Sequence, residues 1–129
     1  MSNIITFETA VKLKEAGFHQ PAPQVGHIWY GLIRGYSEIN MIVSIKDKNV
    51  FIDIHGNQHL QEAFDKFGTY APTVGDLLKE MPDCRLSYYK ELFRAVYLNM
   101  EDADNVHDVI SNEHSVEACA HLYLKRKTI

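Results

Sequence analysis

The densest run of β-branched residues in the chain covers residues 39–55. It predicts a β-hairpin whose loop, residues 46–49, is built around a type I turn. In the register that we expect, Ile42 lies opposite Asp53, and six aliphatic side chains share one face. The six are Met41, Val43, Ile45, Val50, Ile52 and Ile54. Because an isolated hairpin is only marginally stable in water, helices should cover this face, which leaves Asp53 and His55 on the opposite, more polar face.

Apolar residues recur with helical spacing in four places outside this hairpin, over residues 6–16, 57–68, 73–82 and 115–127. Thr6 and Gly17 are suitable residues for the two ends of the first helix. Thr73, followed three residues later by Asp76, predicts a capping box at the start of the third. Residues 27–30 predict a short strand, which together with the hairpin gives a three-stranded antiparallel meander.

Residues 86–98 are compatible with two structures. Periodicity slightly favours a helix, because apolar residues line one side of it. Two β-prone runs separated by Lys90 and Glu91 would instead form a second hairpin, with unfavourable residues in its turn. Residues 101–113 are acidic and are expected to form a loop.

Composition narrows the class of protein. The chain has 129 residues, 46% of them hydrophobic, which is typical of one globular domain. Its net charge is −4, and the 13 Lys and Arg residues are scattered apart from a cluster at residues 125–127, which argues against a nucleic-acid-binding face. Neither a leader sequence nor a run of eighteen apolar residues is present, so no membrane association is expected and the protein is interpreted as soluble and cytoplasmic. Cys84 and Cys119 lack metal-site spacing and are expected to be buried, reduced thiols.

The best candidate for polar chemistry is the pattern formed by Asp53, His55 and His59, which leads from a predicted strand into the first turn of a predicted helix. Carboxylate and imidazole groups at this spacing can bind a divalent metal or, at a helix N-terminus, an anion. The alternative is a polar edge with solvated histidines. A zinc site needs three or four ligands and no further Cys or His has matching spacing, so no metal ligand is assigned.

The acidic segment resembles a calcium-binding loop, with Asp102, Asp104 and Glu113 at the first, third and twelfth positions. Val106 lacks a side-chain oxygen at the fifth position, and His107 replaces the Gly that the sharp turn requires at the sixth. An ordinary acidic surface loop explains this segment better. The chain also lacks glycine-rich phosphate-binding motifs and a nucleophile elbow, so neither a cofactor nor a catalytic residue is predicted.

Several aromatic residues could form a surface for a partner protein, because aromatic side chains are enriched at interfaces. Trp29 is the main candidate, with Tyr30, Tyr36, Tyr88 and Tyr89 as the others. Alternation along a strand directs only one of two neighbouring side chains inward, and filling of the core or a half-buried face explains most of these residues.

Three blocks of sequence carry a resemblance: ITFETAVKLKEAGF at residues 5–18, YAPTVGDLLKEMP at residues 70–82 and VEACAHLYL at residues 116–124. They resemble a group of small uncharacterised proteins encoded by bacteriophages, prophages and other mobile elements of gut-type bacteria. The resemblance implies paired strands before the last helix, which favours the hairpin for residues 86–98. It implies no catalytic residues, and it places the protein in the cytoplasm of the host cell.

The sequence therefore predicts a small single α+β domain, residues 1–129, in which a three-stranded meander and a second hairpin are covered by N-terminal, middle and C-terminal helices. The first functional hypothesis is a non-enzymatic module that binds a host or phage protein, with a homodimer through an open strand edge as one arrangement. The alternative is a metal-dependent hydrolase or small-ligand binder centred on Asp53, His55 and His59.

Overall fold

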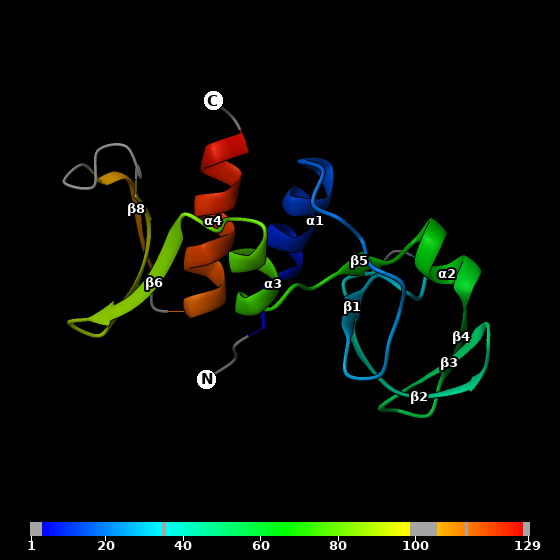
Figure 1. Ribbon diagram of the computed structural model, residues 1–129. Coiled ribbons are helices and arrows are strands. Elements are labelled where there is room, and N and C mark those ends of the chain that lie inside the picture. The colour runs from blue at the N-terminus through cyan, green and yellow to red at the C-terminus, as the bar shows by residue number, and fades with distance from the viewer. Residues whose placement is uncertain (1–3, 35, 99–105, 113, 128–129) are drawn as a thin grey trace. The chain divides into compact units, whose positions relative to one another are not determined.

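The chain folds into two compact units that combine helices with antiparallel sheets, which confirms the α+β class (Figure 1). The computed structural model describes residues 4–34, 36–98, 106–112 and 114–127. One unit, called the central unit, consists of residues 17–71. The other, called the terminal unit, combines the first sixteen residues with everything from residue 72 onward.

The central unit is built on a five-stranded antiparallel sheet with the strand order β4-β3-β2-β1-β5. One short helix, α2, lies between β4 and β5 in the chain. The bounds are β1 Ile28–Tyr30, β2 Ile39–Asp47, β3 Val50–Asp53, β4 Gln58–Leu60, α2 Gln61–Lys66 and β5 Thr69–Tyr70. The predicted meander, β1 to β3, is thus the middle of a larger sheet. One short strand extends it on each side, β4 next to β3 and β5 next to β1, and the sequence pattern revealed neither.

The predicted helix over residues 57–68 is shorter than expected. Its first residues form β4, in which His59 pairs with Phe51 of β3, and the helix N-cap is Leu60. The apolar residues of this segment fit a helix well, but pairing with β3 satisfies the backbone groups of residues 58–60 in a way that periodicity alone does not predict.

The β2–β3 hairpin is present, but our prediction of its buried face is wrong, because the hairpin buries the opposite face. Ile42 does lie opposite Asp53 as predicted. A β-bulge between Ile42 and Ser44 then shifts the register, so that Ser44 pairs with Ile52, and a second irregularity follows between Ile45 and Asp47. The buried side chains are Asn40, Ile42, Phe51 and Asp53, whereas Ile39, Met41, Val43, Ile45 and Ile54 are exposed.

An aromatic cluster explains why this face is the inner one. Phe64 of α2 packs edge-on against Trp29 of β1 and Phe51 of β3, with ring centroids 5.1 and 5.0 Å apart. Edge-to-face pairs of this kind contribute about 1 kcal/mol each beyond their buried area. A Cβ at Gly68 would lie only 2.8 Å from the carbonyl oxygen of Phe64, so the chain turns out of α2 at a residue without a side chain. The largest apolar surfaces of the hairpin region thus lie on the side that we had expected to be polar.

The terminal unit packs helices against a second, three-stranded antiparallel sheet with the order β6-β7-β8. Helix α4 contacts β7 and β8 and also packs against α1 and α3, so it lies between the sheet and the other two helices (Figure 1). The bounds are α1 Phe7–Glu15, α3 Val74–Lys79, β6 Cys84–Tyr89, β7 Leu92–Leu98, β8 Val106–Asn112 and α4 Ser115–Lys127.

The predicted ends of α1 and the predicted start of α3 are confirmed, whereas α3 ends at Lys79, before the expected Pro82, and Ser115 is the first residue of α4 and not its cap. The side chain of Thr6 accepts a hydrogen bond from the backbone N–H of Thr9 at the start of α1, and Gly17 beyond its end has a φ of 93°. Thr73 and Asp76 form the expected capping box at the start of α3. These local signals were sufficient because each depends only on residues that are close in sequence.

The second hairpin is also confirmed, and its turn is unusual. Lys90 and Glu91 connect β6 to β7 with φ angles of 51° and 66°, values that are unfavourable for residues with a Cβ. The expected loop over residues 101–113 is wrong in part, because residues 106–112 form β8 and pair with β7. Cys84 and Cys119 are buried thiols that are not joined in a disulfide, as expected. In the described part of the chain, every helix is too short or too polar to cross a lipid bilayer.

Candidate functional site

A buried carboxylate–imidazole pair lies at the end of the inner face of the central sheet. Asp53 is the last residue of β3, and His59 is the middle residue of β4. The Nε2 atom of His59 lies 2.7 Å from Oδ2 of Asp53, and their side chains are 6% and 0% exposed. The pair forms because β3 and β4 are adjacent and both side chains point to the face covered by α2.

The second oxygen of Asp53 organises the turn that joins β3 to β4. Its Oδ1 accepts hydrogen bonds from the backbone N–H groups of His55, at 2.8 Å, and Asn57, at 3.0 Å. The backbone closes the same turn, since the N–H of Gly56 donates to the carbonyl oxygen of Asp53. Burial raises the pKa of Asp53, but the hydrogen bonds from His59, Asn57 and His55 outweigh it, and the pKa is lowered from its usual 3.8.

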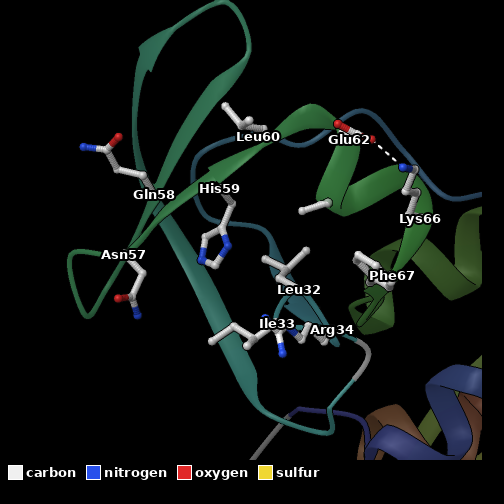
Figure 2. Close-up of a pocket in the computed structure, with 11 residues that line it drawn as sticks. Leu32, Ile33, Arg34, Asn57, Gln58, His59, Leu60, Glu62, Lys66 and Phe67 are labelled. Atoms are coloured by element: carbon white, nitrogen blue, oxygen red, sulfur yellow. Dashed lines mark ion pairs between the residues drawn. The ribbon is translucent and has the colours of Figure 1, made fainter.

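A pocket of about 530 Å³ opens beside His59, within the central unit (Figure 2). Its apolar wall comes from the segment after β1, from β4 and from α2, and comprises Leu32, Ile33, Leu60, Ala63 and Phe67. Its polar wall comprises Arg34, Asn57, Gln58 and His59, together with an ion pair between Glu62 and Lys66. This volume lies within the range of small-molecule sites, which are typically apolar with a few polar groups.

The structure brings together two of the three residues in the predicted polar pattern. Asp53 and His59 are in contact, whereas the side chain of His55 is exposed and only its backbone N–H reaches Asp53. We expected Asp53 on a wet face and His59 in a helix, and both expectations are wrong. Among the described residues, no three His, Cys, Asp or Glu side chains are grouped closely enough to hold a metal ion.

The other predicted site residues do not contribute to this pocket. Trp29, which we considered as a binding surface, is 2% exposed and belongs to the aromatic core. Tyr36 and Tyr88 are exposed, but neither lines the pocket. The residues of the calcium-like pattern, Asp102, Asp104 and Glu113, lie outside the described residues.

Sequence reasoning missed Arg34, Leu32 and Phe67, which complete the pocket. Nothing in their local pattern indicates a site, because they come from segments about thirty residues apart that only the fold brings together. One feature of Arg34 does stand out in three dimensions: its φ is 52°, in the left-handed region that residues with a Cβ rarely adopt.

A second distinctive surface of the central unit is the side of the sheet opposite the aromatic core. We call it the outer face and define it by Ile39, Met41, Val43 and Ile54, which are 40%, 37%, 42% and 58% exposed. Ile54 lies beside Met41, to whose carbonyl oxygen its backbone N–H donates. No charged residue occurs in the chain between Glu38 and Lys46, so the β2 part of this face is free of charge.

Comparisons with known proteins add no family to this picture, because a scan against family models and searches of curated proteins and solved structures find no significant match. The central unit therefore offers two features on which function can be argued, namely the pocket beside the Asp53–His59 pair and the outer face. Among the described residues, none of those that line the pocket is Ser, Thr or Cys.

Proposed function

We propose that the protein is a non-enzymatic protein-binding module that acts in the host cytoplasm as a homodimer, and that the outer face is the surface through which the two copies associate. The observation that carries this proposal is the exposure of four neighbouring large apolar side chains on one side of a sheet. Contiguous exposed apolar surface on a small protein typically marks an interaction site. The resemblance to mobile-element proteins supports a host or phage protein as the target of the assembled module.

The partner that this face fits best is a second copy of the same chain. Interfaces between identical subunits are more apolar than the rest of a protein surface, whereas contacts between different proteins are about as polar as that surface. Specificity for a different protein usually depends on complementary charges, and the β2 part of the outer face carries none. Two such faces stacked about a two-fold axis would form a core like that of a β-sandwich.

Stacking of faces is favoured over pairing of strand edges. The edge strands of this sheet, β4 and β5, have only three and two residues. The end of β2 that extends past β1 carries two register irregularities and Lys46. Short edges, bulges and lysines are the features that oppose edge-to-edge pairing. An apolar face without such protection is the surface that remains for association.

Sedimentation velocity from low to high micromolar protein tests the proposal, with Met41→Lys as the disrupting variant. We expect the wild-type chain to form a dimer that persists in high salt, because an apolar interface contains no charges to screen. A lysine within the stacked faces should weaken the dimer about a hundredfold, because its charge would be buried without a partner. Circular dichroism should show that the fold of Met41→Lys is unchanged, since this side chain is partly exposed.

The matched control is Phe67→Lys, which introduces the same charge at an exposed apolar residue that follows α2 and lines the pocket, away from the outer face. It should leave the dimer intact. A wild-type chain that stays monomeric at every concentration would overturn the proposal of a second copy. Equal weakening by Phe67→Lys and Met41→Lys would also overturn it, because the effect would then follow from charge and not from the outer face.

A further inference from the structure

The pocket beside His59 is a second feature of the central unit, and its lining suggests that it binds a ligand. Three of its lining residues, Ile33, Leu60 and Phe67, are 36%, 55% and 43% exposed, although apolar side chains of this size are usually buried. Ile33 and Phe67 border the cavity together with the buried Leu32, whereas the Leu60 side chain extends from the end of β4 away from His59 (Figure 2). This arrangement suits the apolar body of a small molecule.

Charge is distributed unevenly around the pocket. Lys66 forms an ion pair with Glu62 one helical turn earlier, so its charge is compensated. Arg34, which comes from the segment after β1, has no ion-pair partner among the described residues. A planar guanidinium binds a carboxylate through two parallel hydrogen bonds, which makes it well suited to an anionic group on a ligand.

The backbone of Arg34 provides an independent indication that this position has a role. Its φ of 52° is disfavoured for arginine, and Asn or Gly would adopt it more readily. Backbone conformations of this kind concentrate at binding sites, where the surrounding structure holds them in place. An arginine in a position better suited to Asn or Gly thus points to a function of its side chain.

His59 supplies the second polar contact. Its Nε2 is engaged by Asp53, a carboxylate that can only accept, so the proton of the neutral ring is held on Nε2. Its Nδ1 has no protein partner among the described residues, and the ring forms part of the pocket wall (Figure 2). In this tautomer Nδ1 is an acceptor, which suits a hydroxyl or amide donor on a ligand.

We propose that the pocket binds a small organic acid that has an apolar, preferably aromatic body and a separate hydrogen-bond donor. The acid group lies on Arg34, the body lies on Leu32, Ile33 and Phe67, and the donor group faces Nδ1 of His59. The site is independent of the outer face, so the module would have one surface for a protein and another for a metabolite-sized ligand.

The test uses three related probes: a hydroxynaphthoate with its two polar groups at opposite ends of the ring, naphthoate without the hydroxyl, and naphthol without the acid. Amide resonances of the full chain are followed by NMR during each titration. We expect saturable shifts in residues 32–34 and 57–67, with the hydroxynaphthoate binding most tightly. Loss of the hydroxyl removes the contact with His59, and loss of the acid removes the contact with Arg34.

Arg34→Asn is the informative variant, because Asn tolerates a positive φ and the protein should fold at least as well as the wild type. It should weaken binding of both acids about tenfold and leave binding of naphthol unchanged. Lys46→Gln, which removes an exposed charge that does not line the pocket, is the matched control and should change neither.

Three results would overturn this inference. They are the absence of saturable shifts with the hydroxynaphthoate, shifts confined to the outer face, and unchanged affinity of Arg34→Asn for naphthoate. Each result concerns the pocket alone. The dimer measured by sedimentation would stand or fall separately, and a monomeric chain that still binds the acids would overturn only the proposed function.

Discussion

Each compact unit of this protein buries one carboxylate among its described residues, and the two are held differently. Asp53 in the central unit has partners for both oxygens, namely His59 and two backbone N–H groups. Glu117 on α4 of the terminal unit uses one oxygen only. Its Oε1 accepts from the hydroxyl groups of Thr9, at 2.8 Å, and Thr6, at 3.2 Å, while Oε2 is buried without a hydrogen bond.

The difference shows two ways in which a fold accommodates a buried acid. Asp53 is held by its own strand, the following turn and the adjacent strand, so its hydrogen bonds determine local chain geometry. Glu117 instead connects two helices, and it lies at the N-terminus of α1, where the helix dipole favours negative charge. A buried oxygen without a partner carries a desolvation cost, so the negative charge of Glu117 should contribute far less stability than that of Asp53.

The largest effect is expected for Asp53→Ala. This change leaves His59 and two turn amides without their acceptor, and removal of one partner from a buried pair typically costs about 3 kcal/mol. Urea unfolding followed by the fluorescence of Trp29, the only tryptophan and a residue of the central core, measures this loss directly. Asp47→Ala in the same hairpin is the control and should cost about 0.5 kcal/mol, because Asp47 is exposed and accepts only from its neighbour's N–H. Similar losses for the two variants would mean that the buried Asp53–His59 pair contributes no more to the free energy of unfolding than an exposed carboxylate does.

A smaller and pH-dependent effect is expected for Asp53→Asn. The folded-state pKa of Asp53 lies below its usual 3.8, so its contribution is fully present above pH 3.8 and is lost as the pH falls through the folded-state pKa. At neutral pH the variant should be about 2 kcal/mol less stable than the wild type, because the amide cannot replace the charged acceptor. Acid titrations of Trp29 fluorescence should show this gap narrowing below pH 3.8. A gap that is constant with pH would contradict the assignment of the charge to Asp53.

The smallest effect is expected for Glu117→Gln. The amide oxygen can still accept from Thr6 and Thr9, and the amide nitrogen takes the place of an oxygen that already lacks a partner, so no hydrogen bond is lost and stability should change by about 0.5 kcal/mol or less. Hydrogen exchange of the α1 backbone amides measures this change in the stability of the terminal unit. Thr9→Val is the matched comparison, since it removes the shorter hydrogen bond and should cost about 1 kcal/mol. A loss for Glu117→Gln as large as that for Asp53→Asn would break the distinction between the two acids.

Much of this fold could be predicted because its signals are local. The caps at Thr6 and Thr73, the end of α1 at Gly17 and the long closing helix follow from residues a few positions apart. The second hairpin required more than periodicity, because its turn residues, Lys90 and Glu91, adopt a conformation that their chemistry disfavours.

What could not be predicted depends on contacts between distant segments. The rule that polar residues face water fails at Asp53 and His59, because each satisfies the other and both can therefore be buried. Once these two side chains point inward, alternation along β2 and β3 exposes Met41 and Ile54. The pattern identified the right polar residues and the right opposing pair, Ile42 and Asp53, but it placed them on the wrong side. No sequence pattern indicated that Arg34 and Phe67 would line a pocket.

Because Cys119 is buried, the reactivity of its thiol depends on how often the terminal unit opens. Burial in α4, with a smaller contribution from the nearby Cys84 thiol, raises the pKa of this thiol to about 11. At neutral pH only about one molecule in ten thousand would carry the reactive thiolate, so the folded chain should resist alkylation there. Maleimide would modify Cys119 only during an opening of the terminal unit, so the rate of modification would measure how often that unit opens. The fluorescence of Trp29 would measure unfolding of the central unit separately.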